Sequence, residues 1–277
     1  MKRMIALLAL LCVTFWMGFP SDILSKDDPW KRVDEGLFFR EFDAPRKSKI
    51  EDSKITVVKI NPKVYSFRLF SASEHGRVRM TAKKWCEKYD LSCAVNAGMY
   101  QKDGITNVGY MKNFNHLNNA RLANAYKAVL AFNPVDSTVP EMQIIDLNCQ
   151  DFQSLQFRYQ TFVQNIRMIS CRQENVWSKQ DKMFGMAVFG IDKSGNALLI
   201  FTESPYSGHD FINLLLSLPI SIHNAMYLEG GPEANLYFST HEVQFERIGR
   251  HGPDNGSDTF AVPRAVPNVI GIVKRSK

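Results

Sequence analysis

A carboxylate followed by two glycines stands at the end of an apolar run in the C-terminal half of the chain. Residues 225–228 (AMYL) are apolar, Glu229, Gly230 and Gly231 follow directly, and Glu233 comes two residues later. Glycines let a ligand come close to the backbone. A carboxylate at the end of a buried strand loses hydration, which raises its pKa and suits it to general acid or base chemistry. A tight turn with hydrated carboxylates explains the same residues, so both interpretations stay open.

A similar polar end occurs in the N-terminal half, where the apolar residues 91–95 (LSCAV) are followed by Asn96 and Gly98. The side-chain amide of asparagine is both a donor and an acceptor, which suits sugar hydroxyls or a phosphoryl oxygen. An Asx turn is the structural alternative.

Ser207 and Asp210 have the spacing of a helix-capping pair in front of the apolar residues 211–218. This places His209 in the first helical turn, where exposed backbone N–H groups favour anions. His209 could there act as an acid, a base or a hydrogen donor. Capping alone also explains the serine and the aspartate.

Arg167 lies within the apolar run of residues 164–169 (QNIRMI). A partly buried arginine requires a partner, either a carboxylate or an anionic ligand. Glu203 and Glu229 are the candidate carboxylates.

The order strand, strand, helix, strand occurs twice. The expected strands and helices, in chain order, are residues 54–62, 65–73, 81–89 (helix), 91–100, 184–192, 197–204, 209–218 (helix) and 224–231. We therefore expect an α+β fold with a mixed β-sheet core, a duplicated ββαβ unit and flanking helices. In that arrangement, the polar ends at Asn96 and Glu229 share one site.

Composition limits the class of ligand. The chain has 277 residues, 45% of them hydrophobic and 22% charged, with a formal net charge of +6. The basic residues are scattered, with no basic stripe between aromatics, so we expect no nucleic-acid partner. A mildly basic surface favours anionic ligands. Composition does not define an oligomeric state.

The N-terminus indicates export. Lys2 and Arg3 precede an apolar run, residues 4–19, that ends at Pro20. This pattern is typical of a secretory signal or an N-terminal membrane anchor, with a buried N-terminal helix as the alternative. We expect residues 1–21 to be this segment, 22–49 a linker with a first strand, and 50–277 the functional domain, in the periplasm or outside the cell.

Four cysteines follow the N-terminal segment, at positions 86, 93, 149 and 171. In an oxidising compartment they favour disulfides, and closeness in sequence favours Cys86–Cys93 and Cys149–Cys171. No CxxC motif occurs, which argues against structural zinc. We expect no resident cofactor, although acidic residues such as Glu203, Glu229 and Glu233 leave a divalent metal open.

Five motifs, in the order NAGMY, NVGYMKN, QNIRMI, SPYSGHDF and LEGGPEANLY, resemble the phosphodiester glycosidase domain family, in particular its exported bacterial branch. The resemblance covers roughly residues 50–274. It implies a mixed α/β domain that cleaves sugar-1-phosphodiesters, with Asn96, Arg167 and Glu229 at motif positions. The better-known members carry aspartate where this chain has Glu229, and an arginine in the strand that begins here near Lys182.

Residues and resemblance together predict an exported hydrolase of the glycoside hydrolase type, acting on a glycan or sugar-phosphate. Its expected catalytic residues are Glu229, His209 and Arg167. The expected substrate contacts are Asn96, Gly98, Gln164, Lys182, Ser207, Gly230, Gly231 and Glu233. The alternative is a non-catalytic envelope protein that binds anionic or phosphorylated glycans. The N-terminal segment would supply any membrane association.

Overall fold

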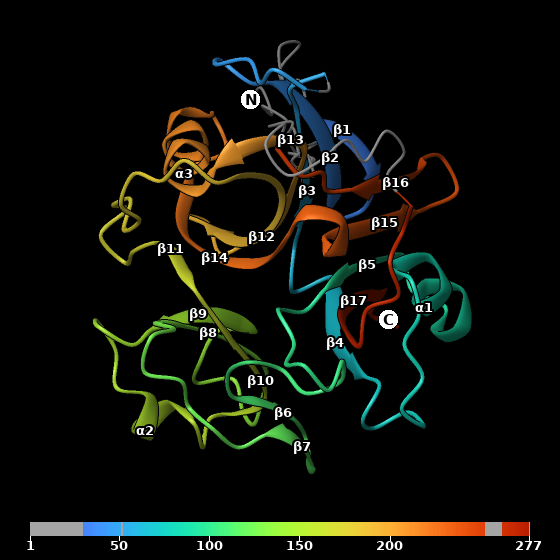
Figure 1. Ribbon diagram of the computed structural model, residues 1–277. Helices are drawn as coiled ribbons and strands as arrows, with labels where there is room; N and C mark the ends of the chain where they lie inside the picture. The colour runs from blue at the N-terminus through green and yellow to red at the C-terminus, as the bar shows by residue number, and fades with distance from the viewer. Residues whose placement is uncertain (1–29, 51, 253–261, 277) are drawn as a thin grey trace, which may run out of the picture.

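Three antiparallel β-sheets make up the fold of the computed structural model, which describes residues 30–50, 52–252 and 262–276 (Figure 1). The largest sheet has seven strands. Their spatial order is β1 (Lys31–Asp34), β2 (Leu37–Asp43), β3 (Lys54–Ile60), β13 (Ala197–Ser207), β12 (Met183–Asp192), β14 (Ile222–Gly230) and β11 (Arg167–Ile169).

The other two sheets have five strands each. The first, here called the β10 sheet, has the order β7 (His116–Asn119), β6 (Met111–Asn113), β10 (Tyr159–Asn165), β8 (Ala128–Pro134) and β9 (Met142–Asp146). The second, the β5 sheet, has the order β16 (Gln244–Ile248), β15 (Asn235–Ser239), β5 (Cys93–Asn96), β17 (Asn268–Lys274) and β4 (Tyr65–Ser71).

One hydrophobic core joins the inner faces of all three sheets. It contains Val58 and Phe189 from the seven-stranded sheet, Leu130 from the β10 sheet, and Phe67 and Leu236 from the β5 sheet. Figure 1 shows the three sheets arranged around this common centre. Burying one such side chain contributes about 1.5–3 kcal/mol, so the shared core is what holds the sheets together.

A helix packs on the outer face of each sheet. Helix α3 (Gly208–Ser217) packs Phe211 and Leu215 on the seven-stranded sheet. Helix α1 (Ala82–Tyr89) places the fully buried Trp85 on the β5 sheet. The short α2 (Phe152–Leu155) lies over the β10 sheet.

Side chains cap the N-termini of the two longer helices, and the cap at Ser207 lies where the sequence predicts it. The Thr81 side chain accepts a hydrogen bond from the Lys84 N–H. The Ser207 side chain accepts one from the Asp210 N–H, 3.1 Å away. Each cap satisfies one of the backbone donors that a helix N-terminus leaves without a partner.

The expectation of an α+β fold with a mixed sheet is wrong. All strand pairs between the described residues are antiparallel, and strands far outnumber the short helices. The predicted hairpin of β3 and β4 does not form, because β3 pairs with β2 and β13 while β4 pairs with β17. In both units that the sequence suggested to be repeats, the strands on either side of the helix flank a third, antiparallel strand. This strand is β12 between β13 and β14, and β17 between β4 and β5.

Of the two expected disulfides, Cys149–Cys171 forms and Cys86–Cys93 does not. Cys86 belongs to the cluster beneath α1, with Ala94. Cys93 belongs to the central core on the other face of the same sheet. Because successive side chains of a strand point to opposite faces, the sheet itself separates the two thiols.

Residues 1–29 lie outside the described part of the chain, and with them the expected signal or anchor segment. Within residues 30–50, 52–252 and 262–276, no helix is long and apolar enough to cross a membrane. Strands β1 and β2, from the region expected to hold a linker and a first strand, add to the edge of the seven-stranded sheet beside β3.

Candidate functional site

The two polar strand ends singled out in the sequence meet at Asn165, the last residue of β10. Its side-chain Nδ2 donates a 2.9 Å hydrogen bond to the Leu228 carbonyl near the end of β14. A methyl group placed on Gly98 would lie only 3.1 Å from the same Nδ2. The ends of β14 and β5 therefore converge on one point, here called the sheet junction.

Buried amides line the β5 side of the sheet junction. Asn96 is 1% exposed, and its Oδ1 accepts a hydrogen bond from the Asn235 N–H at 3.2 Å. The Asn96 Nδ2 and the Asn107 Oδ1 are buried without a hydrogen-bond partner among the described residues. Gly98 lies beside that Oδ1, since a methyl group on it would come within 2.9 Å. Buried amide atoms without protein partners are unusual and suit a water or a polar ligand.

The Glu229 carboxyl at the sheet junction has a raised pKa. Burial at the end of β14 raises its pKa from the ordinary 4.5 to about 8. The Gly230 N–H, which donates to Glu229 Oε1 at 3.0 Å, partly opposes this rise, and the nearby Glu233 carboxylate adds to it. The side chain still reaches solvent at its edge. At neutral pH Glu229 therefore carries a proton that a bound molecule could receive.

The turn after Glu229 requires both glycines. A side chain on Gly230 would overlap the Phe184 ring and the Tyr227 hydroxyl. Gly231 has a φ of +66°, and a methyl group there would lie 2.7 Å from the His251 ring. The chain then forms the short 3-10 helix η1 (Gly231–Glu233). The space beside both glycines is therefore filled by protein side chains.

An ion pair and a tyrosine complete this side of the sheet junction. Glu233 is paired with Arg264, and Asn235 holds the backbone next to both through hydrogen bonds to their carbonyls. Burial raises the pKa of Tyr100; the Arg79 charge lowers it, and the charges of Glu233 and Glu229 raise it further. Tyr100 therefore lies close enough to both carboxylates for their charges to raise its pKa.

Arg167 forms its ion pair with a carboxylate other than Glu229 and Glu233. Its Nη1 contacts both carboxylate oxygens of Asp146, at 2.7 and 2.9 Å. The expected partners, Glu203 and Glu229, are therefore the wrong ones. Burial alone would raise the pKa of Asp146, but hydrogen bonds from the Cys171 N–H and from Arg167 bring it below its ordinary value.

His209 and Gln164 make contacts that build the fold. The His209 Nδ1 lies 2.6 Å from the Trp177 carbonyl. Gln164 is completely buried and joins β10 to the loop before β8, through hydrogen bonds with the backbone of Tyr110, Ala123 and Tyr126. These hydrogen bonds join both side chains to backbone groups outside the two strand ends of the sheet junction.

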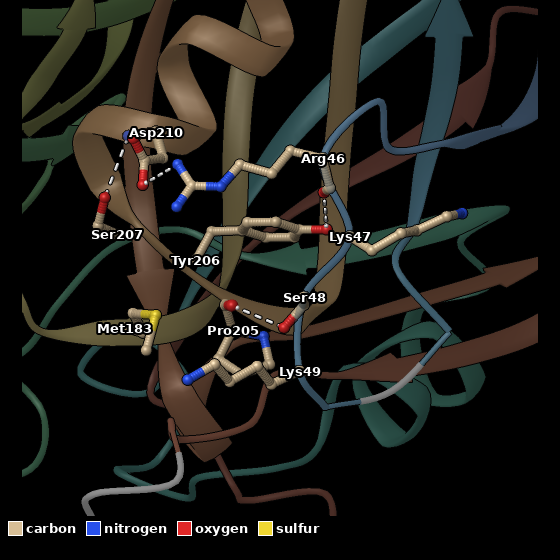
Figure 2. A pocket seen from close by; sticks show the side chains of 9 residues that line it. All are labelled: Arg46, Lys47, Ser48, Lys49, Met183, Pro205, Tyr206, Ser207 and Asp210. Carbon is tan, nitrogen blue, oxygen red and sulfur yellow. Dashed lines mark hydrogen bonds and ion pairs between the residues drawn. The ribbon is translucent and has the colours of Figure 1, made fainter.

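Ser207 and Lys182 lie at the same end of the seven-stranded sheet, beside β12. Ser207 lines a cavity of about 110 Å³ between the loop of residues 46–49 and the start of α3 (Figure 2). There Arg46 pairs with Asp210 at 2.9 Å. Lys182 is exposed, with its Nζ 5.8 Å from the centre of the Phe184 ring.

One group of acidic and cysteine side chains within residues 30–50, 52–252 and 262–276 is close enough to share a metal ion. Asp146, Cys149 and Cys171 form this group, and both cysteines are in the disulfide. Glu203, Glu229 and Glu233, the acidic residues named from the sequence as metal ligands, are not part of this group. For example, Glu203 lies 3.7 Å from the Arg247 Nε, whereas Glu233 pairs with Arg264.

Several residues at the sheet junction carry no individual signal in the sequence. Arg79 and Arg264 come from loops without periodic pattern. Arg79 donates a hydrogen bond to the carbonyl of Ala265, the residue after Arg264, across a separation of 186 residues. His251 faces Gly231 and has a buried Nδ1 without a partner among the described residues. Asn165 and Tyr100 do lie in two of the quoted motifs, QNIRMI and NAGMY.

Comparison with known proteins gives one family match and several similar structures. The profile of the family described as phosphodiester glycosidase matches residues 89–273. The catalytic domain of zebrafish N-acetylglucosamine-1-phosphodiester alpha-N-acetylglucosaminidase, auto-inhibited by its pro-peptide, superimposes with a TM-score of 0.60 at 13% identity, over 87% of this chain and 84% of its own.

Two bacterial structures are also similar. A hypothetical protein from Synechocystis has a TM-score of 0.56 at 13% identity, over 87% of this chain and 62% of its own. A candidate exported protein from Burkholderia pseudomallei K96243 has a TM-score of 0.52 at 10% identity, over 79% of this chain and 74% of its own. At these identities the likeness concerns the fold. No curated protein sequence matches the chain.

Proposed function

The chain belongs to the phosphodiester glycosidase family, and from this premise we propose that it is an exported hydrolase that cleaves the bond between the anomeric carbon of a sugar and a phosphodiester. The matched region, residues 89–273, contains both strand ends that meet at the sheet junction. The zebrafish protein with the same fold is named for an activity on an N-acetylglucosamine-1-phosphodiester.

The observation that carries the proposal is the protonated Glu229 at the sheet junction. With a pKa of about 8, most Glu229 side chains hold a proton at neutral pH. A protonated carboxyl is a poor nucleophile but a good general acid, so we assign it proton donation to the phosphate oxygen that leaves the sugar. From the sequence, both an acid and a base role were open for this carboxyl.

The remaining steps follow the usual logic of two carboxylates around a glycosidic bond. As the bond between C1 and oxygen breaks, its electrons stay on the phosphate oxygen, which takes the Glu229 proton. Water then attacks C1 and gives its proton to the resulting carboxylate, which restores the acid. The Glu233 carboxylate, held by Arg264, is the candidate to stabilise the positive charge that develops at the sugar.

Asn96, Gly98, Gly230 and Gly231 are the proposed substrate contacts, because they belong to the two strand ends that converge at the sheet junction. Arg167 and His209 serve as supports in this proposal. Arg167 is neutralised by Asp146, and the His209 Nδ1 lies against a backbone carbonyl.

We place the protein outside the cytoplasm. The Cys149–Cys171 disulfide is compatible with an oxidising compartment, and one protein of the same fold is a candidate exported protein. Cell fractionation followed by thiol labelling tests this: the exported form should be soluble in the periplasm or medium, or bound to the membrane, with Cys149 and Cys171 unreactive until reduced.

The decisive test measures sugar release from a panel of sugar-1-phosphodiesters by the wild type and by Glu229→Gln. Glutamine keeps the shape but cannot donate the proton, so we expect a loss of at least about 100-fold in kcat, the usual contribution of general acid catalysis. The matched control is Glu242→Gln, an exposed carboxylate whose weak pair is with Lys31 at 3.9 Å. Equal turnover by Glu229→Gln would refute the assignment. Binding without release by the wild type would favour a non-catalytic glycan-binding protein.

A further inference from the structure

A phosphodiester carries a negative charge, so the sheet junction needs a cation whose charge is not already neutralised. Arg167 is neutralised by Asp146, with 2.7 Å between the guanidinium and the carboxylate. Arg264 is neutralised by Glu233. A third arginine, Arg79, stands beside the second of these pairs and forms no ion pair with any carboxylate of the described residues.

The backbone fixes Arg79 in this position. Its neighbour Met80 exchanges two backbone hydrogen bonds with Val266, at 3.3 and 2.9 Å. The Arg79 side chain reaches the adjacent Ala265 carbonyl with both Nε and Nη2, at 3.0 and 2.6 Å. Since Ala265 follows Arg264 in the chain, the Arg79 guanidinium is held next to the Glu233–Arg264 pair.

Arg79 also contacts Tyr100, the tyrosine whose pKa is raised by the charge of Glu229. Its guanidinium carbon lies 5.1 Å from the centre of the Tyr100 ring, and its Nη2 lies 3.4 Å from the Tyr100 hydroxyl. The charges of Glu229 and Glu233 both act on this hydroxyl. Tyr100 therefore connects the arginine to the proposed general acid.

We propose that Arg79, together with the Tyr100 hydroxyl, binds the phosphoryl group of the substrate. Nε and Nη2 hold the guanidinium in place on the Ala265 carbonyl, and Nη2 also donates to the Tyr100 hydroxyl, which leaves the two Nη1 hydrogens to donate to phosphoryl oxygens. Arg79 is exposed, so a ligand can reach it without displacing a protein anion. The inference rests on the proposed function, whose substrate it describes: a sugar bonded at C1 to an anionic phosphate.

A purely structural role for Arg79 makes a different prediction. If it only ties the chain before α1 to the Ala265 segment, replacing it changes stability and leaves phosphate affinity unaltered in the protein that folds. If it binds phosphoryl oxygens, the affinity falls while the neutral part of the substrate binds as before. Arg79→Lys separates the two contributions further, because lysine keeps the charge but lacks the planar fork.

The test is calorimetric binding of inorganic phosphate and of a sugar 1-phosphate to the wild type, Arg79→Gln and Arg79→Lys, with thermal unfolding recorded for each variant. The control is Arg77→Gln, an exposed arginine two residues earlier in the same loop. We expect at least about tenfold weaker binding of both probes to Arg79→Gln, an intermediate loss for Arg79→Lys, and no loss for the control.

Because binding is measured without turnover, this result is independent of whether the protein hydrolyses its ligand. If the wild type binds phosphate through Arg79 but releases no sugar, the hydrolase proposal fails and the phosphoryl site stands. If folded Arg79→Gln binds both probes as tightly as the wild type, or if the wild type binds neither at millimolar concentration, the phosphoryl site is refuted. A proportional loss in Arg77→Gln would also refute it, because the effect would then be general surface charge.

Discussion

Replacing Glu229 by glutamine should change how the stability of the protein depends on pH. In the unfolded chain this carboxyl titrates near its ordinary pKa of 4.5, whereas in the fold it titrates at about 8. Between these values the folded state binds the extra proton, so the free energy of unfolding falls as the pH rises. The stabilisation is complete below the unfolded pKa and is lost as the pH rises through the folded one.

The magnitude follows from the two pKa values. A rise from 4.5 to about 8 corresponds to about 5 kcal/mol in total, at about 1.4 kcal/mol for each pH unit. Between about pH 5 and pH 9 the wild type should lose about 4 kcal/mol through this group. Water that enters with the ionised carboxylate reduces this loss, so the figure is an upper bound. Glu229→Gln has no proton to lose, and it should become the more stable protein at high pH.

The assay is urea unfolding of the wild type, Glu229→Gln and the exposed control Glu242→Gln at several pH values. The difference between wild type and Glu229→Gln isolates this carboxyl, because the buried thiols of Cys86 and Cys93, whose pKa values are also raised, contribute equally to both. We expect that difference to grow with pH, while the control follows the wild type. Parallel curves for wild type and Glu229→Gln would show that Glu229 is not desolvated in solution and would remove the basis for its role as an acid.

The remaining predictions concern activity and the elements around the sheet junction. If Glu229 is the general acid, kcat should fall as the pH rises through about 8, and a rising limb there would instead indicate a base. Reducing Cys149–Cys171, which closes 22 residues, should lower the free energy of unfolding by about 3 kcal/mol, measured by denaturation with and without reductant. Asp146→Ala should cost about 3–5 kcal/mol in the same assay by leaving Arg167 buried without its partner, while a loss below about 1 kcal/mol would contradict the buried pair. Gly231→Ala should destabilise by at least about 1 kcal/mol, because its φ is +66°, and an unchanged unfolding midpoint would contradict that strain.

Local signals were reliable wherever a few neighbouring residues determine the structure. The Ser207 cap forms as its spacing to Asp210 predicts, because capping involves one turn of backbone. The Cys149–Cys171 disulfide also joins cysteines close in sequence. The sequence also showed that two apolar strands end in polar residues, Asn96 and Glu229. The structure brings both strand ends to the sheet junction.

Pairing between distant segments could not be derived in the same way. Strand β4 has the pattern of a hairpin partner for β3, yet it pairs with β17 at the far end of the chain. Alternation along a strand shows which residues are buried, but it does not identify the neighbouring strand. The same limit explains the Cys86–Cys93 error, since nothing local showed that a sheet would stand between the two thiols.

The sequence by itself determined which side chains could do chemistry and that two strands would end in polar residues beside glycines. Only the tertiary structure decided which charges are neutralised: Arg167 meets Asp146, whereas Arg79 meets Tyr100 and no carboxylate of the described residues. The tertiary structure also decided that Glu229 is protonated at neutral pH. The physical reason is that charge pairing and desolvation depend on the distance to atoms from remote parts of the chain, and the packing of three sheets around one core sets those distances.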